Sequence, residues 1–139
     1  MSSLIYNSFW DDLEKGNIDL DSDTFYGMLV TSTYVPDKDA HTKRSDVTNE
    51  ASGTGYTAGG AASAVTLTKD TANDREDAAF ADIAWTGSTI TARGLVLYKH
   101  RGGLASADEL VAYVDFGSDI SSVSGTFTAH FTAPLRIQN

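Results

Sequence analysis

Three aspartates stand at alternate positions near the start of the chain, as the ligands of a calcium-binding loop do. An EF-hand loop beginning at Asp19 would need glycine at position 24 and glutamate at position 30. The sequence has Thr24 and Val30 there, and a strand-like segment follows instead of a helix. We therefore interpret Asp19, Asp21 and Asp23 as a turn leading into a strand, and we predict no metal site.

The segment from Gly53 to Gly60 has the composition of a phosphate-binding loop. Its spacing is not G-x-G-x-x-G, no Lys-Ser or Lys-Thr pair follows it, and no strand clearly precedes it. We expect these glycines to allow positive φ angles in a tight loop that Tyr56 anchors. The sequence therefore predicts no cofactor, whether nucleotide or other.

Asp115-Phe116-Gly117 matches the metal-binding tripeptide of protein kinases by letters alone, because no H-R-D loop or V-A-I-K lysine accompanies it. We expect Gly117 simply to end a strand. The three histidines, His41, His100 and His130, lack the H-x-x-x-H spacing of a zinc site. No serine lies in a G-x-S-x-G turn. We identify no catalytic residues and expect the protein not to be an enzyme.

The charge balance argues against one class of partner. Nineteen acidic residues against ten basic ones give a formal net charge of −9. Nucleic-acid affinity comes mainly from Lys and Arg side chains that displace counterions, so we expect no nucleic-acid partner. The one basic cluster, Lys99-His100-Arg101, is interpreted as part of a solvated loop.

Composition indicates the kind of compartment in which the chain is made and the number of domains it forms. The chain has no cysteine, which suits synthesis in a reducing cytoplasm. Acidic residues follow the start where a signal peptide needs a basic flank, and no apolar run approaches the roughly 20 residues that span a bilayer. We expect an unprocessed protein with no membrane partner. Its 139 residues, 41% of them hydrophobic, fit one domain spanning 1–139.

Residues 4–15 have the periodicity of one short amphipathic helix. Ile5, Phe9 and Leu13 recur every four residues and share a face. Ser2 or Ser3 is expected to cap this helix, and Gly16 stands where a left-handed turn ends many helices. A helix this short is unstable alone, so we expect its apolar face to be buried against a sheet or a neighbouring subunit.

The period then changes from four to two. Residues 24–32 predict a buried strand, and residues 33–60 a long surface loop with a helical turn near 45–51. Residues 61–139 predict continuous antiparallel strands around a polar turn at 70–77. The fold class is therefore mainly β, an antiparallel β-sandwich or barrel with one short N-terminal α-helix. The later strands are expected at Phe80–Thr86, Ile90–Lys99, Glu109–Phe116 and Thr126–Phe131, with Leu135 and Ile137 closing the chain.

The order of several short motifs resembles a widespread group of small virion structural proteins of tailed phages and prophages. The resemblance covers nearly the whole chain; each motif alone is weakly specific, and the ordered set is moderately so. After the N-terminal helix, the motifs are DSDTFYGMLV (21–30), YVPD (34–37), GYTAGG (55–60), IAW (83–85), TARGLVLYK (91–99), LVAYVDFG (110–117) and GTFT (125–128).

The resemblance implies a particle component, and it supplies no catalytic residues. We expect a capsid decoration or cement protein on the outer surface of the phage head, bridging major capsid subunits and associating with copies of itself, with a trimer favoured. The alternatives are a tail or neck ring component and, less favoured, a carbohydrate-binding module or enzyme used at the host surface. The residues expected to contact partners are Tyr34, Val35, Tyr56, Phe9 and Trp10.

Overall fold

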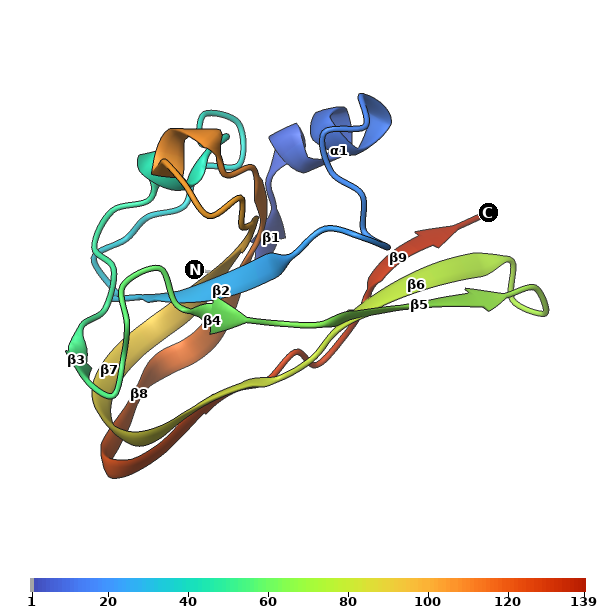
Figure 1. Ribbon diagram of the computed structural model, residues 1–139. Helices are drawn as coiled ribbons and strands as arrows, with labels where there is room; N and C mark the ends of the chain where they lie inside the picture. The colour runs from blue at the N-terminus through green and yellow to red at the C-terminus, as the bar shows by residue number, and fades with distance from the viewer. Residues whose placement is uncertain (1) are drawn as a thin grey trace.

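The computed structural model describes residues 2–139 and contains two antiparallel sheets (Figure 1). The predicted mainly-β class with one α-helix is confirmed, and the sheets are consistent with a sandwich, whereas no closed barrel is found over these residues. The larger sheet has the strand order β1-β8-β7-β2-β4, with β3 also paired to β7, and the smaller has the order β5-β6-β9. The elements are β1 (Leu4–Ile5), α1 (Asn7–Glu14), β2 (Phe25–Val30), η1 (Arg44–Asp46), β3 (Gly53–Thr54), β4 (Ala61–Ala62), β5 (Val65–Asp70), β6 (Arg75–Phe80), β7 (Ile83–Lys99), η2 (Ala105–Ala107), β8 (Leu110–Ala129) and β9 (Leu135–Gln138).

The helix begins later than the sequence predicts. Leu4 pairs with Tyr113 and Ile5 with Ala112, so the start of the expected helix is instead a short strand, β1, at the edge of the large sheet. The Ser2 or Ser3 cap is therefore wrong: the cap position is Tyr6, whose side chain makes no capping hydrogen bond. The left-handed turn at Gly16 is confirmed by its φ of +77°.

Two long strands replace four predicted short ones. β7 and β8 pair along most of their length, with register shifts where the sequence suggested turns. Gly117 has a φ of +83° inside β8, so it forms a bulge and does not end the strand. Figure 1 shows the β7–β8 ribbon bending sharply and continuing into β6 and β9. The two sheets are therefore joined at two places, where β6 continues into β7 and where β8 continues into β9.

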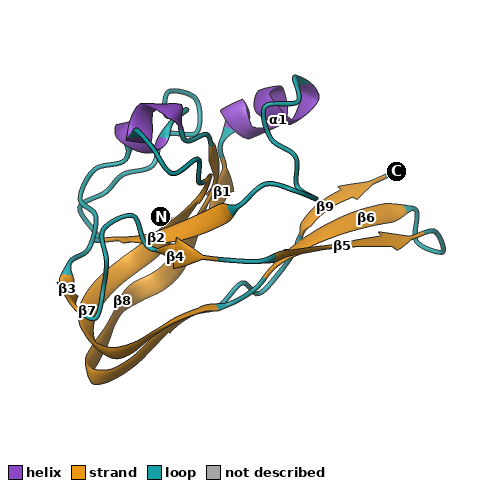
Figure 2. Cartoon of the chain, viewed as in Figure 1, coloured by secondary structure: helices purple, strands orange, loops and turns teal. Residues whose placement is uncertain are grey.

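The large sheet is buried on both faces where β2, the end of β7 and the start of β8 lie side by side. One face carries Phe25, Leu29, Leu95 and Leu97, which pack in a core with Phe9 of α1 and the small sheet's Phe80. The opposite face holds a second core that the loop after β2 covers; Figure 2 shows the helical segments grouped on one side of the molecule. The second core comprises Tyr6, Met28, Val30, Tyr34, Val96, Tyr98, Leu110 and Tyr113.

The segment 33–60 is only partly a surface loop. Tyr34 and Ala51 are buried, β3 pairs with β7, and bridges join Val30 to Glu50 and Lys43 to Glu109. The predicted helical turn is present as η1, slightly earlier than expected. The aperiodic polar sequence does not reveal these attachments, because each one involves only one or two residues of the segment.

Two buried tyrosines of the second core, Tyr34 and Tyr113, differ in whether the hydroxyl group has a hydrogen-bond partner. The Tyr34 hydroxyl lies 2.9 Å from the Tyr6 hydroxyl and 2.9 Å from His41 Nδ1, whereas the buried Tyr113 hydroxyl has no partner among residues 2–139. We expect Tyr34→Phe to lower the free energy of unfolding by about 1–2 kcal/mol and Tyr113→Phe to leave it unchanged or raise it by up to about 1 kcal/mol. Urea denaturation measures both, and a larger loss for Tyr113→Phe would contradict this assignment.

Candidate interaction surface

The five residues expected to contact partners differ in how much of each side chain is exposed. Phe9 and Tyr34 are each 1% exposed, so the prediction that they contact partners is wrong: they pack inside the chain. Tyr56 is half-buried; it donates a hydrogen bond to Glu50 Oε1 at 2.7 Å and accepts one from the Leu29 amide, so it anchors its loop as predicted. The remaining two are exposed, Val35 at 66% and Trp10 at 38%.

Trp10 borders a groove of about 120 Å³ between α1 and the small sheet. Leu67 of β5 and Ile137 of β9, both exposed, form much of its far wall. The sequence indicated that both residues belong to strands but not that they remain uncovered. The groove is lined by Phe9, Trp10, Leu13, Leu20, Leu67, Glu76, Ala78, Leu135, Arg136 and Ile137.

Strand alternation explains why this wall is apolar. The register places Leu67 opposite Ala78 and Ala78 opposite Leu135, so these side chains share one face of the small sheet. The other face is polar, and its side chains pair with one another: Arg136 lies 2.6 Å from Asp77, and Arg75 lies 3.2 Å from Asp70. The helix covers the apolar face only in part, and the groove is the uncovered remainder.

Glu76 is the one acidic residue in the groove lining. Its Oε2 atom is buried and has no hydrogen-bond partner among residues 2–139. Lys69 is its cross-strand neighbour, but no ion pair within 4 Å joins them. Glu76 as a whole is only half-buried, so this oxygen can still accept a hydrogen bond from a group that enters the groove.

The small sheet also has two open edges. In the order β5-β6-β9, the outer strands β5 and β9 each pair on one side only. Open edges present unpaired amide and carbonyl groups that can bind another strand. β5 carries Lys69 near its end, a residue type that discourages indiscriminate strand pairing.

No protein-family model, curated protein or solved structure matches this chain.

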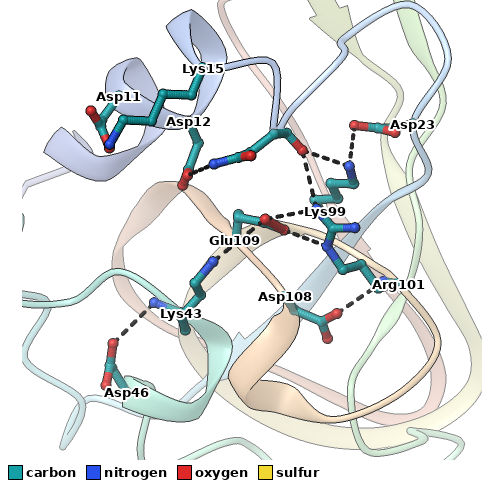
Figure 3. A network of polar contacts seen from close by, with 11 residues as sticks. Asp11, Asp12, Lys15, Asp23, Lys43, Asp46, Lys99, Arg101, Asp108 and Glu109 are labelled. Carbon is teal, nitrogen blue, oxygen red and sulfur yellow. Dashed lines mark hydrogen bonds and ion pairs between the residues drawn. The ribbon is translucent and has the colours of Figure 1, made fainter.

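A second cluster of charged residues ties three loops together (Figure 3). Asp108 is fully buried and accepts hydrogen bonds from Arg44 Nε at 2.8 Å and from the Arg101 amide at 2.9 Å. Glu109 accepts two from the Arg101 guanidinium, at 2.8 and 2.9 Å, and Lys43 lies 3.5 Å away. Both carboxylates are thus already paired within the chain, which makes this cluster a clamp between loops.

Two opposing influences act on the pKa of the Glu109 carboxyl group. Burial alone would raise its pKa, but the Arg101 hydrogen bonds and the positive charges of Lys43 and Arg101 hold the pKa below its usual value. The ionised form is therefore favoured in the folded chain. This pairing stabilises the fold at neutral pH, and the contribution is lost as the pH falls through the lowered pKa.

The basic cluster at 99–101 belongs to this clamp and is not simply solvated. Lys99 Nζ lies 2.8 Å from Asp23, and Arg101 binds Glu109 as described. His100 stacks on Tyr26 with ring centroids 3.9 Å apart. These contacts neutralise the cluster locally, so little free positive charge remains on this loop.

Two of the sequence motifs, the aspartate turn and the glycine-rich loop, have the roles predicted for them. Asp19 accepts hydrogen bonds from the Asp21 amide and the Ser22 hydroxyl, forming the expected turn before β2. Gly60 has a φ of +81°, and a Cβ there would lie 1.8 Å from the Gly27 carbonyl oxygen, so the glycine permits close approach to β2. Within residues 2–139, no group of three or more His, Cys, Asp or Glu side chains could hold a metal ion, and no helix is long and apolar enough to cross a membrane.

Proposed function

We propose that this chain is a structural protein of a tailed-phage particle, a decoration protein that binds the outer surface of the head and bridges neighbouring capsid subunits. The observation that carries the proposal is the small sheet, whose apolar groove and open edges are exposed beside a firmly packed body. The ordered motifs described from the sequence, which resemble virion structural proteins, point the same way.

Exposed apolar surface of this kind is typical of a binding face. Trp10, Leu67 and Ile137 are large apolar side chains gathered around one groove. Scattered apolar residues are common on protein surfaces, but a cluster rimmed by charged residues marks an interaction site. Aromatic side chains such as Trp10 are enriched among the residues that contribute most to binding.

Net charge supports the outside of the shell over its interior. At −9, the chain would be repelled by packaged DNA, and the clamp leaves little free positive charge on the 99–101 loop to offset this. A decoration protein binds after the shell has formed and touches protein only. An acidic surface is compatible with that position.

Size favours an oligomer. A specific interface buries about 1,000 Å² or more in total. One chain exposes 7195 Å², so a single copy that contacted several subunits would commit much of its surface. A trimer on a local threefold axis divides this requirement among three copies and matches the symmetry of the shell.

Deletion of the gene from its phage tests this function. Because a decoration protein adds contacts to a shell that is already assembled, we expect filled heads that lose their DNA at lower temperature than wild-type heads. Adding the purified protein to mutant heads is expected to restore the heat resistance, with a copy number that scales with the number of capsid subunits. Full heads without attached tails would instead identify a neck or tail ring component and would refute the proposal.

A further inference from the structure

We propose that the groove between α1 and the small sheet binds an apolar side chain of the capsid subunit, with an adjacent Lys or Arg of that subunit pairing with Glu76. This inference rests on the proposed function and names the contact that would carry it. The features that support it are the volume of the groove, its apolar wall and its single unpaired carboxylate oxygen.

The groove has the size and chemistry of a side-chain pocket. A cavity of about 150 Å³ lined by aliphatic and aromatic residues accepts a benzene molecule. A groove of about 120 Å³ walled by Leu67, Leu135 and Ile137 therefore has room for one aliphatic side chain. Filling it would remove these side chains and Trp10 from water.

Glu76 determines the charge of the partner. Its buried Oε2 lacks a donor among residues 2–139, while Arg136, which also borders the groove, is already paired with Asp77. A Lys or Arg beside the inserted apolar side chain would supply the missing hydrogen bond and the opposite charge. Such a pair, closed off from water at the centre of an interface, contributes specificity.

A second copy of this chain is a poor match for Glu76. Eight of its ten Lys and Arg side chains already form ion pairs within the chain, so a copy has few free cations to offer. The exposed large apolar residues outside the groove lie on other segments of the chain and are Val35, Leu104, Ile120 and Val123. Self-association of the trimer would then use a different surface.

The test measures binding of purified protein to heads isolated from the deletion phage. Glu76→Gln keeps the side-chain shape and removes the charge, and we expect binding roughly thirtyfold weaker, with a weaker dependence on salt. Leu67→Lys places on the groove wall a charge of the same sign as the partner's, and we expect no detectable binding. Asp119→Asn, which removes one exposed negative charge on β8, is the matched control and should bind as wild type does.

Thermal melting separates a binding role from a structural one. Because Oε2 of this half-buried carboxylate has no hydrogen-bond donor in the described part of the chain, removing the charge should leave the melting temperature of Glu76→Gln equal to or higher than that of wild type. Weaker binding together with a lower melting temperature would overturn the inference by assigning Glu76 a structural role.

The remaining outcomes distinguish failure of the groove contact from failure of the proposed function. If wild-type protein binds heads and both groove variants bind equally well, the groove is not the contact, although the proposed function stands. If wild-type protein does not bind heads, the proposed function itself fails. If sedimentation shows wild-type oligomers that Leu67→Lys dissociates, the groove holds a second copy and the capsid contact is refuted.

Discussion

Replacing Phe9 by alanine is expected to lower the free energy of unfolding by about 3–5 kcal/mol. Phe9 is the one large apolar residue of α1 that is fully buried, and it joins the helix to the main core. A helix of eight residues does not persist in water without such packing, so the cavity would be accompanied by loss of the helix. Urea denaturation followed by circular dichroism measures both effects.

Trp10 provides the control for this variant. Its ring lies next to that of Phe9, with centroids 5.1 Å apart, but it is partly exposed at the groove. Trp10→Ala is therefore expected to cost clearly less stability than Phe9→Ala, since less surface returns to water. Equal losses would mean that α1 is held by both rings, and a larger loss for Trp10→Ala would contradict the burial of Phe9.

Replacing Asp108 by alanine is expected to be similarly damaging, at about 3–5 kcal/mol. The change leaves the partly buried Arg44 guanidinium without its carboxylate and the Arg101 amide without its acceptor. Asp108→Asn retains an acceptor oxygen but not the charge, so its loss is expected to be smaller. Equilibrium unfolding in urea at neutral pH ranks the two variants.

An exposed ion pair supplies the comparison. Asp11 lies 2.7 Å from Lys15 on the surface of α1, where both side chains are mostly in water. Asp11→Ala is expected to change stability little, because solvent and salt screen exposed pairs. If Asp108→Ala were no more destabilising than Asp11→Ala, the clamp would not hold the loops together.

The periodicity of the sequence predicts most of the strands because one face of each is apolar. It failed where pairing depends on distant residues. Leu4 and Ile5 have helical spacing with Phe9 and Leu13, yet β8 recruits them into the sheet. Gly117 resembles a turn residue, because a bulge with positive φ and a strand end use the same residue type.

The candidate surface could be predicted only in part. Trp10 and Val35 were expected to contact partners and are exposed. Leu67 and Ile137 show strand alternation, but alternation indicates which face is apolar and not whether anything covers it. Glu76 carried no distinguishing pattern, since its missing partner becomes visible only when β5, β6 and α1 are placed together.

The pairing of Leu4 with Tyr113 has a consequence for how the chain reaches its native state. This contact brings together residues 109 positions apart, so closing the chain between them costs more conformational entropy than a local contact does. Folds dominated by such distant pairings form slowly, on the order of milliseconds to seconds. During translation, β1 and α1 leave the ribosome well before β8 exists. The apolar face of the helix therefore remains without its β8 contacts until β8 has been synthesised.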